Sequence, residues 1–69
     1  MEFYIKERQP NTFAPWTFVN VATVAAAKRA ARRAQTFQGT QILVGERPRH
    51  GEEIVAVALT NRNDKWEDA

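Results

Sequence analysis

Apolar residues recur every three to four positions in residues 21–39, VATVAAAKRAARRAQTFQG, and this spacing predicts one amphipathic helix. Thr23 is a good N-cap, because its hydroxyl can accept a hydrogen bond from a free amide of the first turn. Gly39 can take the left-handed conformation that closes a helix. We therefore expect the helix to lie within about two residues of 23–38.

The apolar half of this helix consists mostly of methyl groups, so the helix can approach a sheet closely. It is formed by Val24, Ala27, Ala30, Ala31, Ala34 and Phe37. We expect Ala27, Ala31 and Ala34 to be buried and Phe37 to belong to the core. Alanines bury little area, so the larger side chains of the core have to come from the sheet.

Alternation of apolar and polar residues predicts four strands, two before the helix and two after it. They cover residues 2–8, 16–21, 40–46 and 52–60. The last two should form an antiparallel hairpin around the turn RPRHG at 47–51. The chain then reads as one α+β domain over residues 1–69, with the order β-β-α-β-β. One helix packs on an antiparallel sheet of three to four strands, and residues 61–69 form a polar C-terminal tail.

The strand at 52–60 is rich in β-formers and is expected to be central in the sheet. Strict alternation places Val55, Val57 and Leu59 on one face, and Ile54, Ala56 and Ala58 on the other. Because both of its faces are apolar, the sheet surface away from the helix should not be bare. Trp66, the loop residue Phe13 or another chain could cover it, and a homodimer through this open face is therefore one expectation.

The composition argues against catalysis. The 69 residues include no cysteine and no serine, which excludes disulfides, thiolate metal sites and a serine nucleophile. His50 is the only histidine and lies in a predicted turn, so no common zinc set can be assembled. Glu52 and Glu53 are adjacent, and a strand would point them to opposite faces. We expect a protein that is not an enzyme and has no catalytic residues, no cofactor and no metal.

Positive charge is concentrated on the predicted helix. Residues 20–45 carry four bases and no acid, whereas residues 46–69 carry four bases and six acids. The helix bases are Lys28, Arg29, Arg32 and Arg33. They form two like-charge pairs at i,i+4, each unfavourable by roughly 0.2–0.5 kcal/mol. Two interpretations stay open: a solvated basic face whose cations suit the helix dipole, or a binding face.

In the binding interpretation, Arg47 and Arg49 of the hairpin turn assist the helix cations in meeting an acidic partner. A host protein with an acidic surface is the favoured partner, since the net charge of the chain is only +2 and its C-terminal part is acidic. Tyr4, Leu43 and Trp66 are candidate interface anchors, although core packing is the alternative for aromatic residues in so short a chain. Nucleic acid held by phosphate contacts on the basic helix face is the other class of partner.

Residues 26–45, AAKRAARRAQTFQGTQILVG, resemble a segment of small uncharacterised proteins encoded by bacteriophages and prophages. Those proteins share an AKRAA helix, an FQGT turn and an LVG strand, followed by a second strand and a late tryptophan. Here these correspond to the strand at 55–59 and to Trp66. The resemblance carries over no activity or site residue. It implies a mobile-element protein that works inside a bacterial host, where short phage proteins often bind host machinery.

Localisation follows from two further observations. No apolar run approaches the roughly 20 residues that span a membrane. The N-terminal residues MEFYIKERQP do not show the basic-then-apolar order of a signal peptide. We expect a cytoplasmic protein of the bacterial host, without a membrane partner.

Overall fold

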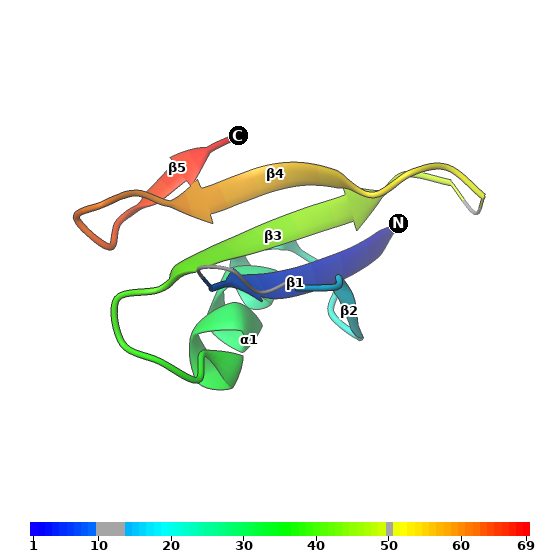
Figure 1. The fold of residues 1–69 in the computed structure, drawn as a ribbon. Helices are drawn as coiled ribbons and strands as arrows, with labels where there is room; N and C mark the ends of the chain where they lie inside the picture. Colours follow the sequence, from blue (N-terminus) through cyan, green and yellow to red (C-terminus); the bar gives the residue numbers. More distant parts are fainter. Residues whose placement is uncertain (10–13, 50) are drawn as a thin grey trace.

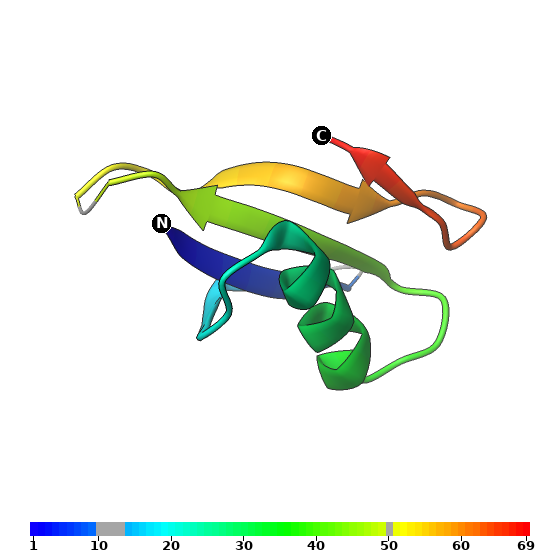
Figure 2. The same cartoon turned by 180° about the vertical axis from the view of Figure 1, so that it is seen from behind.

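The computed structural model describes residues 1–9, 14–49 and 51–69. Five strands and one helix follow one another as β-β-α-β-β-β (Figure 1). They are β1 (Glu2–Arg8), β2 (Thr17–Val19), α1 (Val24–Ala34), β3 (Gln41–Arg47), β4 (Val55–Thr60) and β5 (Trp66–Asp68). The predicted α+β class is confirmed: α1 packs on one face of a single antiparallel sheet, which has five strands rather than three or four (Figures 1 and 2).

The strand order in the sheet is β2-β1-β3-β4-β5, and every neighbouring pair is antiparallel. The middle strand is β3, which pairs with β1 over the whole length of β1, from Glu2↔Arg47 to Arg8↔Gln41. The strand expected to be central, now β4, is an interior strand with β3 on one side and β5 on the other. The predicted hairpin of β3 and β4 is confirmed.

The helix begins where the sequence predicts and ends earlier. Oγ1 of Thr23 accepts a hydrogen bond from the backbone N–H of Ala26 at 3.1 Å, so the N-cap is confirmed. The last helical residue is Ala34, and Gln35 is already extended, with φ −60° and ψ 123°. The side-chain amide of Gln35 donates to the backbone oxygen of Thr40 at 3.1 Å and to its hydroxyl at 3.0 Å. Polar contacts of this kind stabilise a loop over 35–40 in place of another helical turn.

The early end of α1 changes which side chains are buried. Ala27 and Ala31 are 0% and 2% exposed, as predicted. Ala34 is exposed and Phe37 is 55% exposed, so the expectation that they would be buried is wrong. Phe37 lies beyond the last helical turn, and the helical periodicity that placed it on the apolar half no longer applies there.

The core lies between α1 and the face of the sheet that it covers, and α1 contacts β1 and β3. Its fully buried apolar members are Phe3, Ile5, Ala27, Ala31, Ile42, Val44 and Ala58. Thr60 is also buried, and its hydroxyl accepts a hydrogen bond from the backbone N–H of Ile42 at 3.0 Å. The strand side chains supply the bulk opposite two alanines, which is the division of roles that the sequence predicts.

A β-bulge in β4 breaks the predicted alternation of that strand. Val44 pairs with Ala58, whereas the next residue, Gly45, pairs with Ala56, so Val57 is the extra residue. Adjacent residues of β3 face opposite sides of the sheet, and each paired residue of β4 lies on the same side as its partner in β3. Ala56 and Ala58 therefore lie on opposite faces, and the expectation that they share a face is wrong. The strand also begins at Val55 rather than at residue 52.

Residues 61–69 are not a free tail. Trp66–Asp68 form β5, which pairs with β4 through Ala58↔Asp68, Leu59↔Glu67 and Thr60↔Trp66. The turn between the strands is closed by Asn61, whose side-chain oxygen accepts from the backbone N–H groups of Asn63 at 2.9 Å and Lys65 at 3.1 Å. An asparagine side chain that imitates a backbone turn in this way gives a hairpin without a glycine.

The face of the sheet away from α1 is partly covered by the chain itself. The side chain of Trp16, just before β2, reaches the backbone of β3 at Gly45, where it meets Ile54. Trp66 lies on the other side, packed against the core under α1. The prediction that Trp66 covers the face away from α1 is therefore wrong. Phe13, the other predicted cover, lies outside the described residues. No helix in the described part of the chain is long and apolar enough to cross a membrane.

Candidate functional site

The helix cations form two rows with different surroundings. Lys28 and Arg32 lie beside Trp66 of β5: Nζ of Lys28 and Cζ of Arg32 are each 5.6 Å from the centroid of its ring. Arg29 and Arg33 are exposed. We call these four cations and Trp66 the basic cluster. The hairpin of β4 and β5 thus brings one predicted anchor next to two of the four predicted helix cations.

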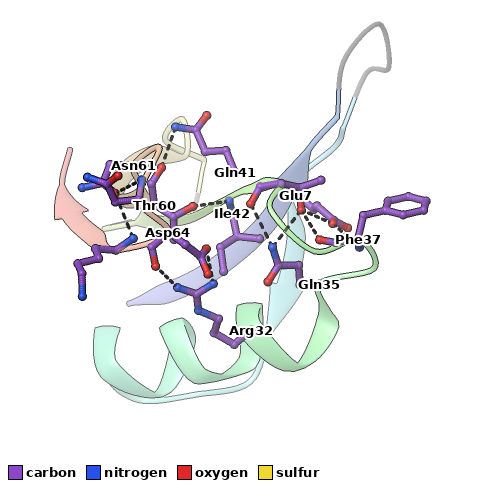
Figure 3. A network of polar contacts seen from close by, with 12 residues as sticks. Glu7, Arg32, Gln35, Phe37, Gln41, Ile42, Thr60, Asn61 and Asp64 are labelled. Carbon is purple, nitrogen blue, oxygen red and sulfur yellow. Dashed lines mark hydrogen bonds and ion pairs between the residues drawn. The ribbon is translucent and has the colours of Figure 1, made fainter.

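Arg32 also holds the β4–β5 turn against the helix (Figure 3). Its guanidinium donates to the carboxylate of Asp64 and to the backbone oxygen of the same residue, each at 2.7 Å. Asp64 has a positive φ of 62°, which an aspartate tolerates in a turn. The two side chains are 33% and 54% exposed, and an ion pair this exposed contributes about 1 kcal/mol or less. The contact orients Arg32 while leaving it open to exchange with another carboxylate.

The two turn arginines do not join the basic cluster. Arg47 ends β3 on the face away from α1, where its Cζ lies 5.1 Å from the ring centroid of Tyr4. Its guanidinium is 3.5 Å from the carboxylate of Glu2. Arg49 is exposed, two residues beyond the end of β3. The expectation that both arginines assist the helix cations is not supported by this arrangement.

The other two predicted anchors are packed into the open face. Tyr4 and Leu43 are only 9% and 7% exposed. The ring of Tyr4 meets the ring of Phe18 edge to face at 5.7 Å, and its hydroxyl donates to the carboxylate of Glu2 at 2.9 Å. Burial raises the pKa of the Tyr4 hydroxyl, and this hydrogen bond raises it further. Tyr4 and Leu43 therefore stabilise the sheet surface, and Trp66 is the predicted anchor that lies beside the helix cations.

Glu7 organises the connection from α1 to β3, and the sequence did not single it out (Figure 3). Its carboxylate accepts from the backbone N–H groups of Thr36 and Phe37, each at 2.9 Å, and from the hydroxyl of Thr40. Desolvation raises the pKa of Glu7, but these hydrogen bonds outweigh it and lower the pKa to about 2. A charged residue at a strand position gives no pattern from which this contact could be predicted.

The anchored loop presents Phe37 to solvent. The backbone of Phe37 is fixed by Glu7, while its ring extends away from the protein (Figure 3). A cavity of about 250 Å3 lies nearby, between α1, β1 and the segment that leads into β2. Its lining includes Ile5, Pro15 and Ala31, with Glu7 at its polar side. It is bordered by Ala14, which follows the undescribed residues 10–13.

Among the residues that the structure describes, no group of three or more His, Asp or Glu side chains could hold a metal ion. Glu52 and Glu53 are exposed ahead of β4, and His50 lies outside the described residues.

Comparison with protein-family models, with curated proteins and with solved structures finds no significant match to this chain.

Proposed function

We propose that this protein is a small non-catalytic binding module that engages a host protein with an acidic surface through the basic cluster. One observation carries the proposal: Nζ of Lys28 and Cζ of Arg32, both on α1, each lie 5.6 Å from the ring centroid of Trp66 in β5. Tryptophan and arginine are the residue types most enriched where binding energy concentrates in protein interfaces.

The charge pattern of α1 supports an acidic partner. Arg29 and Arg33 are exposed, one helical turn apart, and carry like charges. Their repulsion costs free energy in the isolated protein, and carboxylates of a partner would relieve it. Cations at the rim of an interface mainly speed encounter and select the partner, while a central aromatic side chain contributes more of the affinity. In the basic cluster the aromatic side chain is Trp66, and Lys28 and Arg32 lie beside it.

Arg32 adds a specific feature to this surface. Its guanidinium already binds a carboxylate, that of Asp64, in an exposed and weakly held pair. A partner carboxylate can therefore take the place of Asp64 at little cost, in a geometry that the arginine fork already favours.

A phage or prophage origin and a location in the bacterial cytoplasm are part of the same proposal. They rest on the resemblance of residues 26–45, the segment that contains the helix cations. A protein from a mobile element has host proteins as its available partners, and a binding module without catalytic groups fits that setting.

Affinity capture from a bacterial lysate tests the proposal, with one half of the lysate treated with nuclease. A specific host protein should be retained equally in both halves, because its contact with the basic cluster does not require nucleic acid. Retention that disappears after nuclease treatment would instead favour phosphate binding by the helix cations.

A further inference from the structure

The face of the sheet away from α1 carries a second cluster of aromatic and basic side chains. Its members belong to β1, to β2 and to the residue just before β2. The register Tyr4↔Phe18 places the members from both strands on the face of the sheet away from α1. They are Tyr4, Lys6, Arg8, Trp16 and Phe18. We call this set the aromatic platform. It lies across the sheet from the basic cluster, so it is a separate surface.

The aromatic rings of the platform are held in place by one another and by the sheet. Phe18 is 54% exposed, and the edge of its ring meets the ring of the buried Tyr4 at 5.7 Å with an interplanar angle of 70°. Trp16 rests on Gly45, and Nζ of Lys6 lies 4.5 Å from the centroid of its ring. Phe18 is thus a supported ring with much of its surface open to solvent.

The charges of the platform suit phosphate groups. Lys6 and Arg8 are two residues apart on β1, so they project from the same face about 7 Å apart along the strand. Of the acids on this face, Glu2 already accepts from the hydroxyl of Tyr4 and lies 3.5 Å from Arg47, and Glu67 lies in β5 at the other edge of the sheet. The β1–β2 side of the open face is therefore aromatic and positively charged.

We propose that the aromatic platform binds single-stranded nucleic acid, with a base stacked on Phe18 beside Trp16 and phosphates held by Lys6 and Arg8. A positively charged surface with supported aromatic rings is the arrangement by which sheet proteins bind single strands, and stacking tolerates any base. A duplex keeps its bases stacked inside and cannot use the rings. An apolar peptide would have to desolvate both cations without a counter-charge.

The test uses a fluorescein-labelled dT12 strand and its U12 counterpart, with binding followed by fluorescence anisotropy over a salt series. Wild-type protein should bind at low salt and lose affinity as salt rises. Phe18→Ala should weaken binding by roughly 5- to 150-fold, the loss expected for one stacked base. Phe37→Ala is the matched control, because Phe37 is 55% exposed in a loop that Glu7 holds on the opposite face of β1, and it should bind like wild type. Tighter binding of U12 than of dT12 would identify RNA, rather than DNA, as the preferred single-stranded ligand.

A spectroscopic readout separates stacking from simple charge attraction. Trp66→Phe leaves Trp16 as the only tryptophan, and dT12 should quench its fluorescence in that variant. Lys6→Gln should reduce the slope of log affinity against log salt.

Three results would overturn the inference. The first is equal affinity of Phe18→Ala and wild type for dT12, and the second is equal affinity of wild type for dT12 and for a duplex of the same length. The third is a dimer, seen by sedimentation, that Phe18→Ala dissociates, since a second copy would then occupy the platform. Binding of dT12 that depends on Arg29 and Arg33 and is unaffected by Phe18→Ala would place nucleic acid on the helix instead.

Discussion

The ring of Trp16 lies on the backbone of Gly45 in β3. Trp16 comes just before β2, and β1 lies between β2 and β3, so its side chain reaches across β1. A Cβ atom on Gly45 would stand 2.9 Å from Cη2 and 3.0 Å from Cζ3 of Trp16, and 2.7 Å from Cγ2 of Ile54. Real Cβ atoms do not approach other carbons so closely, so only glycine fits under this ring. The β-bulge at the same position places Ala56, another small residue, opposite Gly45.

Gly45→Ala should therefore destabilise the fold by about 1–3 kcal/mol, the usual cost of forcing extra volume into a packed site. Urea denaturation measures the change. The double variant Gly45→Ala/Trp16→Leu should lose less stability than the sum of its single variants, because a smaller side chain relieves the overlap. A Gly45→Ala protein as stable as wild type would show that Trp16 does not occupy this position.

Glu7→Gln should destabilise the protein by about 1–2 kcal/mol at neutral pH, since the loop 35–40 loses charge-assisted hydrogen bonds. The pKa of Glu7 in the folded protein is about 2, below its ordinary value of 4.5. Its contribution is therefore complete above pH 4.5 and is lost as the pH falls from there towards 2. Urea titrations at several pH values should show the gap between wild type and Glu7→Gln narrowing over this range.

Glu53→Gln is the control for this pH experiment, because Glu53 is exposed ahead of β4. It should follow the wild-type stability at every pH. A gap between wild type and Glu7→Gln that stays constant from pH 6 to pH 3 would contradict the assigned role of Glu7.

Ala31→Glu should unfold the domain, because Ala31 is 2% exposed between α1 and the sheet and a carboxylate there would be buried without a partner. Ala25→Glu is the matched control: Ala25 is exposed in the first turn of α1, where an acid suits the helix dipole. Circular dichroism during heating distinguishes the two. Equal melting temperatures for Ala31→Glu and wild type would mean that the buried face of the helix is wrongly assigned.

Periodicity predicted most of the fold because most of it is amphipathic. It gave the helix start at Thr23, the burial of Ala27 and Ala31, and the whole of β1. It failed where a local contact replaced regular geometry. The helix ends at Ala34 because the carboxylate of Glu7 and the side chain of Gln35 hold the next loop, and neither contact follows a sequence period.

The bulge at Val57 and the strand β5 were missed for related reasons. A bulge adds one residue to a strand and inverts the alternation beyond it, which a regular period cannot anticipate. The polar residues 61–65 suggested a tail, yet Asn61 builds a turn from its own side chain and returns the chain to β4.

The candidate site was predicted in part. The helix places Arg29 and Arg33 on its exposed side, as the wheel requires. The contact of Trp66 with Lys28 and Arg32 depends on β5, so no reading of the helix alone could find it. The separation of Arg47 from these cations depends on which face of β3 it occupies.

The most direct test of the basic cluster is a comparison of two charge-reversed proteins in affinity capture from nuclease-treated bacterial lysate. Arg29→Glu/Arg33→Glu reverses the exposed row of α1, and Arg8→Glu/Arg49→Glu makes the same change in net charge away from the cluster. Both pairs are exposed, so both variants should fold. We expect the host protein retained by wild type to be retained by Arg8→Glu/Arg49→Glu and lost by Arg29→Glu/Arg33→Glu. Retention of the same protein by all three would contradict the proposed role of the basic cluster.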